Sequence, residues 1–333
     1  MVQQKNLIDE VSGWLSLYDD GSVDRTWTGP PEVKFLVEPL PPHEDFIDGV
    51  ATRDVITAGN HRVRLYLPEK IPGDKEKLPI LVQFHGGGFC ISEADWFMYY
   101  QFYTRLARSA RVIIVSPFLR HAPENRLPAA IDDGFSTLLW LQLIARGDAE
   151  EPWLQNHGEF NRVFLTGDSS GGNIVHEVAA RAGKANLDPV QLAGGIPVHP
   201  GFVRSSRSKS ELEKPESPFF TLDMLDKFLS LALPLGANKD HPITCPMGDG
   251  APPLKGLKLP PYLLCVAEMD LVIDIQTEYY EAMKKANKDV ELFVSKGMTH
   301  SFYLNKIAVD MDPNTGAETD ALIAKVKEFI QQH

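Results

Sequence analysis

The stretch GDSSG at 167–171 contains a candidate nucleophile and the small residues that would mount it. It follows the apolar run RVFLT and precedes NIVHEVAARA, whose pattern predicts a helix. Where a strand turns sharply into a helix, the turn residue is strained and exposed, and residues two positions away must be very small. Gly167 and Gly171 flank Ser169 in this way, whereas Ser170 lacks glycines at both positions, so Ser169 is the predicted nucleophile. The alternative is a glycine turn without chemistry.

Three consecutive glycines follow an earlier apolar run, PILVQ, in the stretch FHGGGF at 84–89. A backbone without side chains can turn its N–H groups toward a developing negative charge. We therefore expect the N–H groups of Gly87 and Gly88 to form an oxyanion hole. Gly86 is expected to shape the loop, and the N–H of Ser170 to complete the hole. The alternative is a flexible loop.

A serine hydroxyl becomes an effective nucleophile only when a base accepts its proton and an acid holds that base. In a protein with such a strand–turn–helix serine, the acid and then the histidine follow it in the chain, each after a later strand. His241, His300 and His333 lie well downstream of Ser169. We favour His300, because it follows the strand-like run VELFVSK, whereas His241 lies in a segment without strands and His333 ends the chain.

The run YLLCVAEMDLVID offers three acids, Glu268, Asp270 and Asp274. The predicted strand ends near Ala267, which places Asp270 in the loop at the carboxyl edge of the sheet. We expect Asp274 to cap the following helix. Glu268 is the structural alternative, since its side chain can bond the loop. Asp270 is therefore the predicted acid that holds His300.

Short apolar runs alternate with helix-like stretches along most of the chain. The runs PILVQF, RVIIVS, RVFLTG, GGIPV, YLLCVAE and VELFVSK predict buried strands, and VITAGNHRVRLYLP predicts a hairpin. Helices are expected over 94–109, 128–146, 171–184, 274–286 and 317–331. Such alternation predicts the α/β class, with a mostly parallel central sheet flanked by helices.

Two segments fall outside this alternation and are expected to cover the strand ends. Residues 203–250 begin charged and rich in serine, then become helical without a buried strand. A helix is predicted over roughly 5–17, before a proline-rich stretch. We expect one domain over 1–333, with a helical cap built from about 1–45 and 203–250.

Composition excludes several classes of protein. The net charge of −12 argues against binding of nucleic acid, which needs clustered Lys and Arg. No run is long enough for a membrane span, and the first residues do not resemble a secretory signal. Three sparse cysteines suggest neither disulfides nor a zinc site. A cytoplasmic protein without metal or organic cofactor is expected.

Together, HGGGF, GDSSGGNI, AEMDLVID and GMTHSF resemble the hormone-sensitive-lipase-like branch of the α/β-hydrolases. With WLSLYDDGSVDR, VHPGF and LALPLGANKDHP, the likeness to the plant carboxylesterases extends over nearly the whole chain. The resemblance implies the α/β-hydrolase fold and hydrolysis of small carboxylic esters, with a short-to-medium acyl preference. It implies an acyl-enzyme on Ser169, with Asp270 and His300 completing a triad. Asp168 matches an aspartate that supports the site without acting as the acid.

Two relatives of this family do not hydrolyse esters and provide the alternative functions. Gibberellin receptors keep the fold and the serine but lack the histidine, so His300 argues against a hormone-binding protein. Isoflavonoid dehydratases are lyases that can retain much of the triad, some with threonine at the nucleophile position. Ser169 argues against that threonine form.

Overall fold

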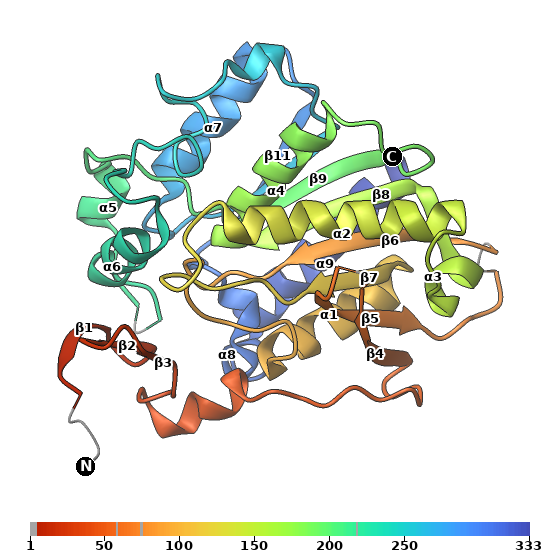
Figure 1. Ribbon diagram of the computed structural model, residues 1–333, viewed down its shortest axis with the longest axis horizontal. Helices are drawn as coiled ribbons and strands as arrows, with labels where there is room; N and C mark the ends of the chain where they lie inside the picture. The colour runs from red at the N-terminus through yellow and green to blue at the C-terminus, as the bar shows by residue number, and fades with distance from the viewer. Residues whose placement is uncertain (1–4, 58, 74–75, 218) are drawn as a thin grey trace.

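A sheet of eight strands runs through the centre of the molecule (Figure 1). The computed structural model describes residues 5–57, 59–73, 76–217 and 219–333. The strand order is β11-β10-β9-β8-β6-β7-β5-β4; β5 pairs antiparallel with β4 and β7, and the other neighbours pair parallel. The strands are β4 (Val50–Ile56), β5 (Arg62–Pro68), β6 (Leu78–Phe84), β7 (Ile113–Pro117), β8 (Gly158–Asp168), β9 (Leu192–Val198), β10 (Tyr262–Ala267) and β11 (Val290–Ser295). The predicted mostly parallel sheet is confirmed.

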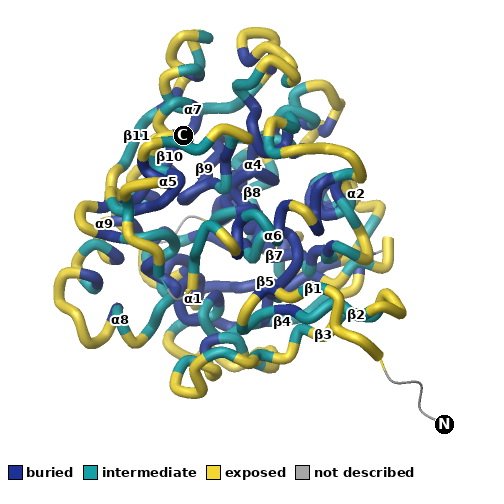
Figure 2. Tube along the Cα trace, turned by 90° about the vertical axis from the view of Figure 1, so that its left-hand side faces the viewer, coloured by how far each residue is buried: buried dark blue, intermediate teal, exposed yellow. Residues whose placement is uncertain are grey.

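The six apolar runs form strands because the sheet is covered on both faces. In β6, Ile80 and Val82 enter one hydrophobic core while Leu81 enters the other, and all three are fully buried. Alternate side chains of a strand point to opposite faces, so a strand covered on both sides needs a continuous apolar run. In Figure 2 the central strands are buried and the loops around them are exposed.

Helices cover each face of the sheet (Figure 1). α1 (Phe97–Ala110) and α9 (Pro313–Gln332) pack together on one face. α2 (Ala129–Arg146), α4 (Ser170–Ala182) and α7 (Ile273–Lys285) cover the other. These five helices correspond to the five predicted ones, with ends that differ by up to four residues. The remaining helical segments around the sheet are short: α3 (Pro152–His157), α8 (Lys306–Met311), η2 (Leu254–Gly256) and η3 (Phe302–Leu304).

The helix predicted over roughly 5–17 is wrong. β1 (Leu7–Val11), β2 (Leu15–Tyr18) and β3 (Val23–Asp24) form a small antiparallel sheet there. Gly13, with φ of 81°, turns the chain between β1 and β2, and the N–H of Trp14 donates to the carbonyl of Val11 across that turn. A positive φ suits a glycine turn between two short strands and breaks a helix. Between residue 5 and residue 45, the helical part is one 3₁₀ helix, η1 (Pro31–Val37).

The segment 203–250 leaves the sheet between β9 and β10, as predicted. Its helices are α5 (Lys209–Glu213) and α6 (Leu222–Ala232), and its described residues add no strand to the central sheet. Thr221 is the N-cap of α6, and its side chain accepts from the N–H of Met224. The apolar side of α6 packs into the core. In the described part of the chain, no helix is long and apolar enough to cross a membrane.

Candidate functional site

Ser169 occupies the sharp turn between β8 and α4. Its backbone lies at φ 50° and ψ −123°, a conformation that side-chain-bearing residues rarely adopt. A Cβ on Gly167 would lie 2.5 Å from the carbonyl of Gly171, and a Cβ on Gly171 would lie 2.1 Å from the carbonyl oxygen of Phe84. Glycine is therefore required at both positions, for the reason expected from the sequence.

The three glycines after β6 form a tight loop beside this turn. Gly87 and Gly88 have φ of 97° and 60°, and a Cβ on either would lie within 2.5 Å of a neighbouring atom. The N–H of Gly86 donates to Oδ1 of Asp168 at 3.1 Å. Gly86 thus fixes the loop to the end of β8. Because its N–H already donates to Asp168, it is not a candidate oxyanion donor.

The hydroxyl of Ser170 makes a structural contact that was not predicted from the sequence. Its Oγ accepts a hydrogen bond from the N–H of Phe89 at 3.2 Å, which joins the start of α4 to the glycine loop. By contrast, the N–H groups of Gly87, Gly88 and Ser170 donate to no group among the described contacts. All three residues line one cavity with Ser169. This arrangement leaves backbone donors available for an anion.

Asp270 and His300 form a buried pair at the carboxyl ends of β10 and β11. Oδ2 of Asp270 lies 2.7 Å from Nδ1 of His300. The carboxylate is fully buried and also accepts from the N–H of Val272 and from Nε2 of Gln276, both at 3.1 Å. Burial alone would raise the pKa of Asp270, but the charge and hydrogen bond of His300 outweigh it and lower this pKa. Asp270 is thus held as a carboxylate that orients the imidazole.

The other ring nitrogen of His300 is free for chemistry. Nε2 is buried and has no hydrogen-bond partner among the described residues. His300 and Ser169 line the same cavity, whose volume is about 510 Å³. A buried ring nitrogen without a partner is costly unless another group, such as a hydroxyl or a ligand, uses it.

The competing acids and histidines lie elsewhere. Oε2 of Glu268 accepts from the N–H of Gly297 at 2.8 Å, so it bonds the loop that precedes His300. The prediction that Asp274 caps α7 is wrong: Oδ2 of Asp274 accepts from the N–H of Ser210 in the 203–250 segment. His241 and His333 do not line the cavity.

Two further side chains support His300, and neither was predicted. Nε2 of Gln276 bridges the carbonyl of Pro200 and the Asp270 carboxylate, at 3.0 and 3.1 Å. His199 accepts from the N–H of Ser301 at 2.9 Å through Nδ1, which fixes the backbone beside His300. Burial lowers the pKa of His199 to about 3, so this ring is neutral. The only sequence signal was the VHPGF motif, which contains His199.

Asp168, directly before the candidate nucleophile, is also buried. Burial raises the pKa of Asp168 to about 7, against the opposing charge of His300 and the hydrogen bond from Gly86. Its Oδ1 contacts the glycine loop through the N–H of Gly86, and the supporting role that the resemblance implies for Asp168 stays a prediction. Within the described ranges, no group of three His, Cys, Asp or Glu side chains could hold a metal ion.

Aromatic side chains from the N-terminal segment and from the 203–250 segment line the cavity. Trp14 packs edge-on against Trp27 with ring centroids 4.5 Å apart, and Trp27 stacks on Phe219 at 6.5 Å. Phe220 stacks on His300. All four line the cavity. The N-terminal segment and the 203–250 segment therefore meet at the cavity that Ser169 also lines.

Arg25 ties the N-terminal segment to the glycine loop. Its Nε donates to the carbonyl of Cys90 at 2.6 Å, and its guanidinium pairs with Glu124 at 2.5 Å. Because the guanidinium is planar and forms several charge-assisted bonds at once, it fixes both the distance and the orientation of Arg25 relative to these partners. The N-terminal segment is thereby attached close to the expected oxyanion donors.

Comparison with known proteins gives the family. Residues 81–304 match the model of a family described as having the alpha/beta hydrolase fold. The chain is 36% identical over 304 residues to a protein named probable carboxylesterase 6 of Arabidopsis thaliana, covering 90% of this chain and 85% of that protein. It is 38% identical over 266 residues to the chloroplastic tuliposide A-converting enzyme 1 of Tulipa gesneriana, covering 79% and 67%. It is 35% identical over 335 residues to 2-hydroxyisoflavanone dehydratase of Glycyrrhiza echinata, covering 98% and 97%.

Solved structures agree on the fold. Carboxyl esterase 2 of the fungus Tuber melanosporum superposes with a TM-score of 0.68 at 21% identity, over 91% of this chain and 95% of that one. The Francisella virulence factor BioJ gives a TM-score of 0.70 at 22% identity, over 88% and 87%. The chain therefore belongs to the α/β-hydrolase family and, within it, to the branch of the plant carboxylesterases.

Proposed function

We propose that the protein is a serine carboxylesterase that hydrolyses small carboxylic esters of short-to-medium acyl length. The observation that carries this proposal is the Asp270–His300 pair at 2.7 Å, with Nε2 of His300 unpaired in the cavity that Ser169 lines. The cavity volume of about 510 Å³ suits a small-molecule ligand. Esterase relatives support the same reaction class.

In the proposed reaction, Nε2 of His300 accepts the proton of Ser169 Oγ while that oxygen attacks the ester carbonyl. Asp270 holds the imidazole through Nδ1 and stabilises its positive charge. Collapse of the tetrahedral intermediate breaks the bond to the alcohol, which leaves with the proton from His300. Water then attacks the acyl-serine by the same route, which frees the acid and restores Ser169.

The N–H groups of Gly87, Gly88 and Ser170 are the proposed oxyanion donors. Gly86 sets the loop but is not itself a donor, because its N–H is committed to Asp168. The positive end of α4 is directed at the same position, since its first N–H groups have no partner within the helix. Loss of one such donor costs about two to three orders of magnitude in rate in comparable enzymes.

Hydrolysis of a p-nitrophenyl ester series by the wild type and by Ser169→Ala tests the proposal. The wild type should turn over acetate to hexanoate esters, and the variant should lose turnover while keeping its fold. Full activity without Ser169 would refute the assignment of the nucleophile.

A lyase is the second candidate, because the dehydratase of Glycyrrhiza echinata aligns with nearly the full chain. Dehydration of a 2-hydroxyisoflavanone, measured beside ester hydrolysis, separates the two. A gibberellin-receptor-like binding protein is the third. The intact Asp270–His300 pair weighs against it, and tight gibberellin binding without ester turnover would support it.

We further propose that the chain is one domain in which about 1–45 and 203–250 act together as the cap. For its location we propose a reducing compartment, because Cys90, Cys245 and Cys265 are buried free thiols. The cytoplasm fits this expectation, whereas the tulip relatives are named as chloroplastic or amyloplastic. A fluorescent fusion expressed in plant cells separates these compartments.

A further inference from the structure

The 203–250 segment places an aromatic ring directly on the imidazole of His300. The ring centroids of Phe220 and His300 are 4.1 Å apart, with an interplanar angle of 18°. Phe220 lies just before α6, 80 residues before His300 in the chain. The side chain of His300 is only 7% exposed, so little of this face contact is shared with solvent.

The pair with Asp270 fixes only one point of the His300 ring. Its single hydrogen bond at Nδ1 does not by itself prevent the ring from tilting about that contact, because Nε2 has no partner among the described residues. The His199 ring also lies nearby, with centroids 6.0 Å apart, but it is inclined at 47° to the imidazole and is not stacked on it. A flat ring stacked on the imidazole face resists this tilt. The stack therefore sets the direction in which Nε2 points, which decides how well it reaches a hydroxyl on Ser169.

We propose that Phe220 is a positioning residue for His300, supplied by the cap, so that the cap completes the proton-transfer machinery as well as covering the substrate. This inference rests on the proposed esterase function. Phe220 forms no bond and exchanges no proton in the proposed mechanism; it acts through the orientation of the imidazole.

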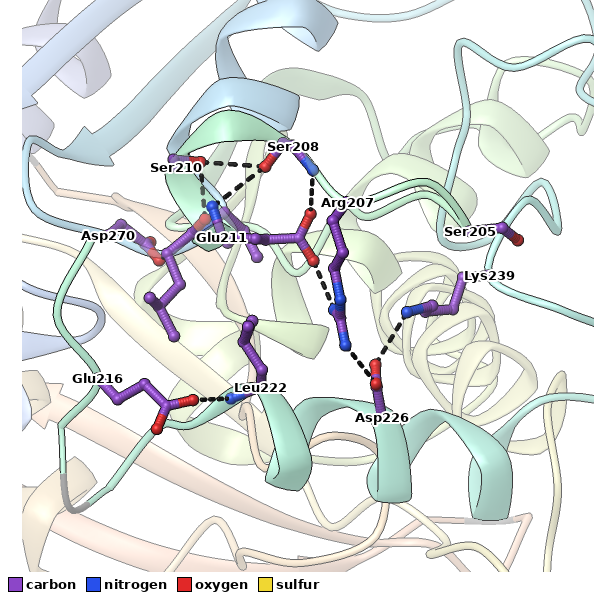
Figure 3. Close-up of polar contacts among 12 residues, drawn as sticks. Ser205, Arg207, Ser208, Ser210, Glu211, Glu216, Leu222, Asp226, Lys239 and Asp270 are labelled. Carbon is purple, nitrogen blue, oxygen red and sulfur yellow. Dashed lines mark hydrogen bonds and ion pairs between the residues drawn. The ribbon is translucent and has the colours of Figure 1, made fainter. Parts of the chain in front are cut away.

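The backbone around Phe220 is held tightly enough for this role. Ser217 and Phe220 exchange backbone hydrogen bonds of 3.1 Å in both directions. Oε1 of Glu216 accepts from the N–H of Leu222, the first residue of α6, at 2.8 Å (Figure 3). These bonds tie the backbone of Phe220 to Ser217 and the start of α6 to Glu216.

A charged network joins α5 to α6, the helix that follows Phe220. Arg207 bridges Glu211 of α5, at 2.7 Å, and Asp226 of α6, and Lys239 also pairs with Asp226 at 2.9 Å (Figure 3). The Glu211 side chain is fully buried, and Arg207 is its charged partner. On the other side of α5, Oγ of Ser210 donates to the carbonyl of Leu271, next to Asp270. The segment that carries Phe220 is thus attached beside the acid that holds His300.

The neighbouring Phe219 offers a matched comparison. It stacks on Trp27 of the N-terminal segment at 6.5 Å, and its only ring contact among the described residues is with that tryptophan. Both phenylalanines line the cavity. Truncation of Phe219 should therefore alter substrate binding, whereas truncation of Phe220 should alter the chemical step.

Steady-state kinetics on p-nitrophenyl butyrate test this division. Phe220→Leu should lower kcat about three- to tenfold, the range expected for loss of one aromatic stack, with KM within about twofold of the wild type. Phe220→Tyr keeps the ring and should retain the wild-type kcat. Phe219→Leu should act mainly on KM. Leu235→Ala, in the same segment and 84% exposed, should leave both constants unchanged.

Proton NMR of His300 gives a readout that is independent of turnover. A ring stacked on the imidazole shifts its Hε1 resonance upfield, and this shift should vanish in Phe220→Leu and persist in Phe220→Tyr. Wild-type kcat in a folded Phe220→Leu protein, or equal impairment of the Leu and Tyr variants, would overturn the inference and leave the esterase proposal intact. Absence of ester turnover by the wild type would instead overturn the proposed function, and this inference with it.

Discussion

Substitution of Gly171 by alanine should disable the site while leaving the proposed catalytic side chains unchanged. The new Cβ would lie 2.1 Å from the carbonyl oxygen of Phe84, where contacts below 3.0 Å are essentially never observed. The start of α4 and the end of β6 must therefore separate by about 0.9 Å. Phe84 leads directly into the glycine loop, so the expected oxyanion donors move relative to Ser169 by a similar distance. A misplacement of about 1 Å can cost about 10²-fold in rate, which is the loss in kcat/KM that we expect.

The assay is kcat/KM on p-nitrophenyl butyrate, with circular dichroism and thermal unfolding to verify the fold. Gly134→Ala is the matched control. Its Cβ would meet only side-chain atoms, of Phe84 and Val178 at 3.0 Å and of Ile174 at 3.2 Å. It should lower the free energy of unfolding by about 1–3 kcal/mol through overpacking and leave kcat/KM within about threefold. The reasoning is refuted if a folded Gly171→Ala protein retains wild-type kcat/KM, or if Gly134→Ala loses as much.

Three further predictions concern the groups around the nucleophile. Asp270→Asn should lower kcat by about 10³- to 10⁴-fold, because an amide cannot hold His300 in the required tautomer; a loss below tenfold in stopped-flow turnover would contradict this. Ser170→Ala removes the acceptor of the Phe89 N–H and should lower kcat about tenfold, yet mass spectrometry should still find a phosphonate label on Ser169. The pKa of Asp270 lies below its ordinary value of 3.8 in the folded protein, so its carboxylate stabilises the fold above that pH. This contribution is lost as the pH falls through the folded-state pKa. Below pH 4, the free energy of unfolding measured in urea should therefore fall more steeply with pH in the wild type than in Asp270→Asn.

The buried strands could be predicted because each carries its own signal. A strand covered on both faces needs a continuous apolar run, and PILVQF and YLLCVA are short runs of this kind. The N-terminal strands carry no such run. Their apolar residues Val11 and Leu15 are four apart, a spacing that also fits a helix, and the turn at Gly13 separates them instead.

The candidate site could be predicted as far as local motifs extend. Gly171 and Gly87 were required by backbone geometry that a pentapeptide or a glycine run already implies. The contacts of Gln276 and Phe220 were not predictable, because each joins segments that only the folded chain brings together. The local sequence pattern around Gln276 or Phe220 does not indicate which distant residue each contacts.

The central claim is that Ser169 is the nucleophile of an ester hydrolase. Its most direct test is to inactivate the protein with a fluorophosphonate, digest it, and locate the adduct by tandem mass spectrometry. We expect one stoichiometric adduct on Ser169, loss of ester turnover in proportion to labelling, and no adduct in His300→Ala. An adduct on Ser170, or full ester turnover in the fully labelled protein, would contradict it.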